Sequence, residues 1–93
     1  MHKLVLQSEA VNDMQEAFEW YEQQKEGLGF DFIDEVENSF EKIKKHPHYY
    51  TAINARYRRL KVNRFPYLVV FETEAETVIV NSVFHTSRRS PND

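Results

Sequence analysis

A cluster of cations lies near the middle of the chain, directly before its most apolar stretch. Residues 56–64 read RYRRLKVNR and hold five Lys or Arg side chains, and the apolar run YLVVF begins three residues later. A guanidinium presents paired donors that match the two oxygens of a carboxylate or a phosphate. We therefore expect a surface that binds an anionic partner, with four candidate members: Arg56, Arg58, Arg59 and Lys61.

Two further residues have side chains suited to cleaving RNA. Attack of a ribose 2′-hydroxyl on its phosphate needs a base, an acid for the leaving oxygen, and a cation facing the phosphate. Arg64 could supply the cation and His85 the acid, because imidazole titrates near neutral pH. The base is harder to assign, since this stretch offers arginines, which stay protonated, and the lone Lys61. The set is therefore incomplete for RNA cleavage.

The same side chains also have a purely structural interpretation. Cations on an edge strand prevent it from pairing with other chains, which would account for Arg56, Arg58 and Arg59. Alternation along a strand would place Arg56 and Arg58 on one face and Arg59 on the other, so the three could not all serve one site. Arg64 could be a turn residue paired with an acid of the first helix. His85 could be a hydrogen-bonded residue at a strand end.

Length and composition indicate one small domain that spans residues 1–93. Seven Phe, five Tyr and one Trp can fill a compact core, and the chain has no cysteine for disulfides or thiolate metal sites. Its histidines are scattered and lack carboxylates at ligand spacing, so we expect neither a metal site nor a cofactor. The beginning, MHKLVLQSEA, lacks the apolar core of a signal peptide, and no stretch is long enough to cross a membrane. These features predict a cytoplasmic protein.

The charge is distributed unevenly along the chain. The net charge is −3, but residues 1–46 carry eleven acids and five Lys or Arg (−6), whereas residues 47–93 carry four acids and seven Lys or Arg (+3). Nucleic-acid binders are usually basic overall or strongly basic on one face. The charge therefore favours a protein partner over RNA, although a local basic patch suffices in some proteins.

The first half of the chain has the apolar spacing of helices. In residues 9–24 the apolar side chains recur at steps of three and four, typical of one helix face: Val11, Met14, Phe18 and Tyr21. Ala10 and Ala17 widen this stripe, and Asp13 is expected to lie away from it. Residues 30–45 show the same spacing, with lysines in the last turn and Pro47 as a stop. Gly27 and Gly29 lie between the two stretches and predict a tight turn. The two helices should therefore form an antiparallel hairpin.

The second half changes to the period of two that strands show. Residues 48–55 are expected to form a loop, and residues 86–93 a flexible tail. The predicted strands are residues 3–7, 56–62, 67–73 and 77–84. This order, β-α-α-β-β-β, predicts an α+β fold. The helical hairpin should cover one face of a small, mainly antiparallel sheet of four strands, because neither layer can bury its apolar side alone.

The chain resembles the RelE/ParE superfamily of small bacterial toxins, in its ParE-like plasmid stabilisation branch, over nearly its whole length. Each matching motif is short, but the motifs occur in order and at similar spacing. They are Trp20-Tyr21-Glu22, Gly27-Leu28-Gly29 with Phe32, Ile43 before Pro47, Arg58-Arg59, Arg64-Phe65-Pro66-Tyr67, and His85 with Arg88-Arg89.

The resemblance implies a toxin that is encoded beside an antitoxin and neutralised by it. Relatives inhibit DNA gyrase or cleave mRNA in the ribosome, and the fold alone does not choose between these activities. We expect a protein target such as gyrase; the alternatives are a RelE-type mRNA endoribonuclease using Arg64 and His85, or a non-toxic member. A homodimer or a toxin–antitoxin hetero-oligomer is also implied. The residues expected to bind the antitoxin or the target are Arg56, Arg58, Arg59, Lys61, Arg88 and Arg89.

Overall fold

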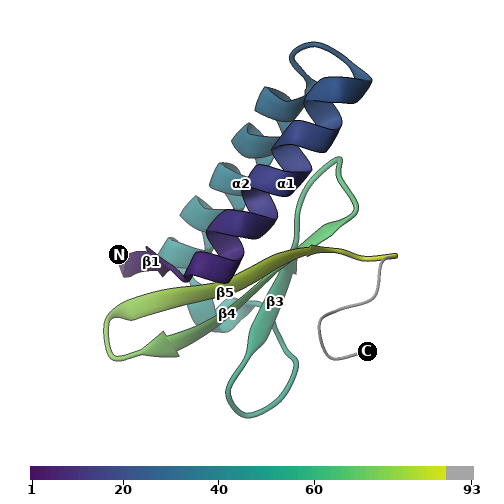
Figure 1. The fold of residues 1–93 in the computed structure, drawn as a ribbon. Helices are drawn as coiled ribbons and strands as arrows, with labels where there is room; N and C mark the ends of the chain where they lie inside the picture. Colours follow the sequence, from purple (N-terminus) through teal and green to yellow (C-terminus); the bar gives the residue numbers. More distant parts are fainter. Residues whose placement is uncertain (88–93) are drawn as a thin grey trace.

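Two helices and five strands make up the part of the chain that the structure describes. The computed structural model describes residues 1–87 (Figure 1). Its elements are β1 (Lys3–Leu6), α1 (Ser8–Gln24), α2 (Leu28–Lys45), a short 3₁₀ turn η1 (Pro47–Tyr49), β2 (Thr51–Ala52), β3 (Arg58–Lys61), β4 (Tyr67–Glu74) and β5 (Thr77–His85). Within these residues, no helix combines the length and apolar character needed to cross a bilayer.

The strands form one mixed sheet in the order β1-β5-β4-β3-β2. β1 lies parallel to β5, and the other neighbouring strands are antiparallel. The predicted element order is confirmed, but the sheet has a fifth strand where residues 48–55 were expected to form a loop. β2 holds two residues and pairs with the start of β3, which begins at Arg58 instead of residue 56. A strand this short has no period that a sequence pattern could reveal.

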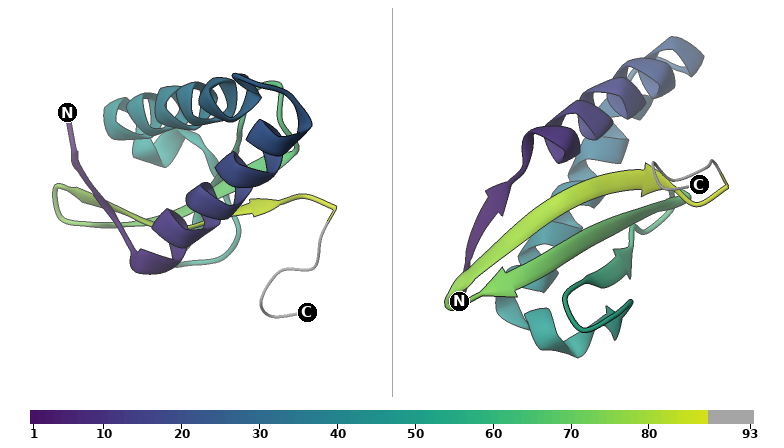
Figure 2. Two further views of the ribbon diagram at one scale, coloured as in Figure 1. Left: turned by 45° about the horizontal axis from the view of Figure 1, so that its top comes forward. Right: turned by 60° about the horizontal axis from the view of Figure 1, so that its bottom comes forward.

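The helical hairpin covers one face of the sheet, as predicted (Figures 1 and 2). Side chains from both layers meet in a core that excludes water almost completely. Its largest fully buried members are Phe32, Val36 and Ile43 of α2, Val62, Val69 and Phe71 around β4, and Val78, Val80 and Val83 of β5. At one end of this core the rings of Tyr21, Phe32, Phe65 and Tyr67 pack with centroids 4.9–6.1 Å apart. We call the uncovered side of the sheet the open face.

The buried side of α1 differs from the predicted apolar stripe. Tyr21 is buried as expected, but Val11 is 48% exposed, while Ala10 and Ala17 are almost completely buried. Asp13, expected away from the core, is half-buried against β5. Because small side chains let a helix approach its neighbours closely, the contact line of α1 is marked by alanines. The two alanines expected at the margin of the stripe therefore lie at its centre, and Val11 lies outside it.

The turn between the helices is held by one carboxylate. Gly27 adopts a left-handed conformation (φ 89°), which glycine tolerates without steric cost. Glu22 of α1 accepts hydrogen bonds from the backbone N–H groups of Gly27 (3.1 Å) and Gly29 (2.8 Å). Gly27 is the N-cap of α2 and Gly29 lies in its first turn, where N–H groups have no partner within the helix. Glu22 therefore caps α2 from the preceding helix.

The close contact between the helices at Gly29 predicts a strong effect of Gly29→Ala. A Cβ atom there would lie 2.7 Å from the carbonyl oxygen of Phe18 and 2.8 Å from its ring. We expect a loss of about 1–3 kcal/mol in the free energy of unfolding, measured by urea denaturation. Gly27→Ala is the matched control: it meets no atom within 4 Å and should cost only about 1 kcal/mol for its positive φ. A Gly29→Ala protein as stable as wild type would contradict this packing.

Asp13 connects α1 to an irregular part of β5. The register between β4 and β5 shifts at Val70 and Phe71, and the N–H of Val83 donates to Asp13 Oδ2 (3.0 Å). Partial burial raises the pKa of Asp13, and the nearby charges of Glu9 and Glu16 raise it further; the Val83 hydrogen bond acts in the opposite direction. The fold therefore favours the protonated form of this carboxyl more than the unfolded chain does.

This shift predicts the pH dependence of an Asp13→Asn variant. The stabilisation from a raised acid pKa is complete below the ordinary value of 3.8 and is lost as pH rises through the raised value. Asparagine keeps an acceptor for Val83 without a charge, so Asp13→Asn should be at least as stable as wild type at neutral pH. Its advantage should shrink as the pH is lowered.

Urea unfolding of both proteins across the acidic range measures this difference. Asp13→Ala serves as the comparison: it leaves the Val83 N–H without its acceptor and should be about 1–3 kcal/mol less stable than Asp13→Asn at every pH, because neither variant has a carboxyl that titrates. An Asp13→Asn protein that is less stable than wild type by the same amount at all pH values would show that ionisation of Asp13 is irrelevant to stability.

Candidate functional site

The open face of the sheet combines apolar side chains with cations. Burial alternates along β4, where Tyr67, Val69 and Phe71 point into the core. The residues between them therefore face the other way. Through strand pairing, Leu68 is flanked by Lys61 and Phe84, and Val70 by Arg59 and Ser82. In the right-hand view of Figure 2, β4 and β5 lie in front of both helices, which leave this face uncovered.

Arg56 lies on the open face and binds an internal carboxylate. Its Nε donates to Glu72 Oε1 at 3.0 Å. This hydrogen bond and the charge of Glu72 are the main causes that raise the pKa of Arg56. The expected alternation grouped Arg56 with Arg58, and this was wrong: Arg56 precedes β3 in a loop and reaches over the face that Arg59 shares. Arg59 is exposed there, in register with Val70.

Two of the predicted binding cations hold the backbone instead. Arg58 lies opposite the core residue Phe71 and donates from Nη1 to the carbonyl oxygen of Tyr50 (2.8 Å). Lys61 donates from Nζ to the carbonyl oxygens of Val62 (3.0 Å) and Phe65 (3.2 Å). Arg58 thereby ties β3 to the segment before β2, and Lys61 closes the turn between β3 and β4.

The structure places Arg64 in the turn before β4. Arg64 has a left-handed backbone (φ 70°), and its guanidinium lies 3.8 Å from Asp31 and 3.7 Å from Glu35. These acids belong to α2, so the expected pairing with an acid of the first helix was wrong. The guanidinium also lies over the ring of Phe65, 5.6 Å from its centroid. Its described contacts are thus with α2 and the aromatic end of the core.

His85, the last residue of β5, lies opposite Tyr67 at the same end of the sheet as Arg64. Its ring packs edge-on against the Tyr67 ring with centroids 5.2 Å apart, and its Nδ1 accepts a hydrogen bond from the N–H of Ser87 (3.0 Å). The candidate catalytic residues therefore lie on the helix-facing side of the sheet, away from Arg59. Arg88 and Arg89 lie outside the described residues.

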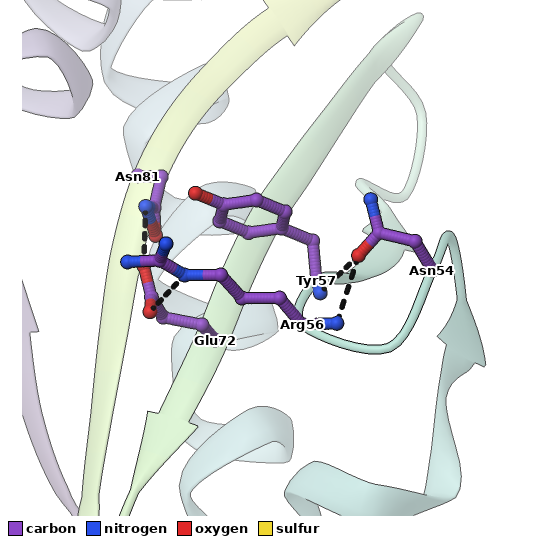
Figure 3. A network of polar contacts seen from close by, with 5 residues as sticks. All are labelled: Asn54, Arg56, Tyr57, Glu72 and Asn81. Atoms are coloured by element: carbon purple, nitrogen blue, oxygen red, sulfur yellow. Dashed lines mark hydrogen bonds and ion pairs between the residues drawn. The ribbon is translucent and has the colours of Figure 1, made fainter.

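A polar network on the open face was missed by the sequence reasoning (Figure 3). Asn54 Oδ1 accepts hydrogen bonds from the N–H groups of Arg56 and Tyr57, both at 2.8 Å. Glu72 Oε2 accepts a hydrogen bond from Asn81 Nδ2 (2.8 Å). Two sequence signals could have indicated it: an asparagine two residues before Arg56, which favours a side-chain-capped turn, and one acid at an outward position of an apolar strand.

A groove of about 660 Å³ adjoins this network. It runs across β4 and β5 between the start of α1 and the loop before β3. Its lining is part apolar and part polar: Gln7, Ser8, Glu9, Ile53, Asn54, Tyr57, Val70, Asn81, Ser82 and Phe84. Across residues 1–87, no three His, Asp or Glu side chains are grouped so that they could hold a metal ion. The described surface therefore offers cations, apolar side chains and a groove large enough to admit side chains of another molecule.

Comparison with known proteins identifies the family. The model of the ParE toxin of the type II toxin–antitoxin system, parDE, matches residues 4–90. A chain of the chromosomal ParDE toxin–antitoxin system from P. aeruginosa has a similar structure, with a TM-score of 0.82 and 11% sequence identity over 94% of this chain and 98% of that one.

The isolated E. coli RelE toxin has a TM-score of 0.70 and 15% identity, over 97% of this chain and 89% of that one. No curated protein matches the sequence. At these identities the two solved structures establish the fold alone, whereas the family match spans nearly the whole sequence and confirms the resemblance seen there. The chain belongs to the ParE toxin family of type II toxin–antitoxin systems.

Proposed function

We propose that this toxin inhibits growth by binding a protein target such as DNA gyrase, and that a cognate antitoxin neutralises it by docking on the open face. The observation that carries the docking proposal is the exposed Arg59 beside apolar side chains on a sheet face that no helix covers. An acidic, partly apolar segment would match both features of this surface.

The contacts of the other cations favour binding over RNA cleavage. Lys61, the one lysine near the candidate cluster, is engaged with two backbone carbonyls. Arg64 lies beside two carboxylates of α2, which a phosphate would have to displace. The net charge of −3 adds a general repulsion toward RNA.

Expression of the protein in growing bacteria tests the target. We expect growth arrest, intact mRNA and stabilised cleaved DNA–gyrase complexes when the purified protein is added to gyrase and DNA. mRNA cleavage that requires ribosomes and is lost in Arg64→Ala or His85→Ala would assign an endoribonuclease instead. Unimpaired growth with neither effect would mark a non-toxic member and overturn the proposal.

A charge reversal at Arg59 tests the docking surface. Arg59→Glu should weaken the affinity for the antitoxin encoded beside the toxin by at least tenfold, or about 1.4 kcal/mol, because an acidic segment would meet a like charge. Isothermal titration calorimetry measures the change. Lys25→Glu makes the same charge change at an exposed position after α1 and should leave the affinity nearly unchanged. Equal effects of the two variants would exclude a specific contact at Arg59.

A further inference from the structure

Arg56 already binds a carboxylate in the absence of a partner. Its side chain is 69% exposed, whereas that of Glu72 is only 12% exposed. Both Glu72 oxygens are engaged, Oε1 by Arg56 Nε and Oε2 by Asn81 Nδ2. Arg56 is therefore accessible from solvent, and its ion pair with Glu72 shows that its guanidinium binds a carboxylate at this position.

The loop that carries Arg56 keeps its shape by contacts of its own. Asn54 accepts hydrogen bonds from two N–H groups of the loop, and the N–H groups of Ile53 and Asn54 donate to the carbonyl oxygen of Tyr57 (2.8 and 3.4 Å). Neither set of bonds involves the guanidinium. Arg56 can consequently exchange one carboxylate for another without rearrangement of the loop.

We propose that Glu72 is an internal stand-in for a carboxylate of a protein partner: on docking, an acidic side chain of the partner replaces Glu72 on Arg56, and a neighbouring apolar side chain enters the groove. The groove begins beside Arg56, because Tyr57 lines it together with Ile53, Val70 and Phe84. The inference rests on the proposed docking of an antitoxin on the open face, and it specifies the chemistry of the docked segment.

Little free energy is needed to separate Arg56 from Glu72, and the new ion pair with the partner is stronger once the partner is docked. The side chain of Arg56 is 69% exposed, so water screens its attraction to Glu72 and makes the Arg56–Glu72 pair a weak competitor. Glu72 keeps its hydrogen bond from Asn81 when Arg56 moves. A partner that covers Arg56 also excludes water, and this strengthens the new ion pair.

The surroundings favour a protein segment over a nucleic acid as the source of the anion. Glu9 lines the groove, and Glu72 and Glu74 both lie on β4. These carboxylates would repel the successive phosphates of a polyanion. A peptide needs only one acidic side chain here and therefore meets less repulsion. The apolar wall formed by Val70 and Phe84 offers nothing to a phosphate chain but can hold an aliphatic side chain.

Binding of a short fluorescein-labelled peptide of alternating glutamate and leucine, followed by fluorescence anisotropy, tests the exchange. Glu72→Gln removes the competitor and should tighten binding about threefold. Arg56→Gln should weaken it by a similar factor. The double variant should bind no more tightly than Arg56→Gln. Glu74→Gln, which removes the same charge from an exposed position on the same strand, controls for the change in net charge.

The exchange requires that Glu72→Gln and Arg56→Gln change the peptide affinity in opposite directions. If the pair only positions the loop, Glu72→Gln and Arg56→Gln will shift affinity in the same direction, and the exchange is overturned. A tightening in Glu74→Gln equal to that in Glu72→Gln, or tighter binding of a labelled single-stranded oligonucleotide than of the peptide, also overturns it. Thermal unfolding checks that Glu72→Gln is folded. If it is not, Glu72→Asp replaces it: the shorter side chain reaches Arg56 less well, so the peptide should bind more tightly. Unchanged peptide affinity in Glu72→Asp would count against the exchange.

Peptide binding also separates this inference from the docking proposal. Affinity that falls in Arg59→Glu but is unchanged in Glu72→Gln overturns the exchange and leaves docking on the open face supported. Affinity insensitive to both variants, or no binding of the peptide to any variant, counts against docking on the open face as well.

Discussion

Burial of only one face of the sheet determines which side chains form the core and which remain open to other molecules. The helical hairpin covers one face of β4 and β5, so alternate residues such as Val69, Phe71, Val78 and Val80 are buried. The intervening residues must then lie on the opposite face, whatever their chemistry. Apolar side chains there have no helix to cover them. The fold thereby produces an apolar surface that is available to another molecule.

The same alternation places the cations of residues 56–64 in different surroundings, where they make different contacts. Arg58 and Lys61 hold backbone carbonyls, and Arg64 lies beside acids of α2. Arg59 remains exposed on the open face, and Arg56 joins it there by reaching to Glu72. Much of the positive charge in this half of the chain therefore stabilises the short β2–β3–β4 connections. The surface available for binding is smaller than the number of cations suggests.

Membership of the ParE toxin family fits a scaffold that keeps its architecture while its sequence changes. Identities of 11% and 15% accompany TM-scores of 0.82 and 0.70. In this chain the fold depends on the alternation of buried residues and on the close contact of the helices, where Gly29 meets Phe18. The open face carries no such packing requirement. A shared fold does not specify a function, so the function of this chain is argued from individual side chains.

The family, the element order and the helical layer could be predicted from the sequence, because they follow from periodicity, glycine positions and motifs along the chain. The sequence also located Arg64 and His85 at the ends of β-elements. Three features required the folded molecule: the two-residue β2, the exposure of Val11 on α1 and the partners of each cation. Glu72 meets Arg56 across sixteen residues, and Asp13 meets Val83 across seventy. Such contacts depend on how strands and helices come together in space, which local sequence patterns do not encode.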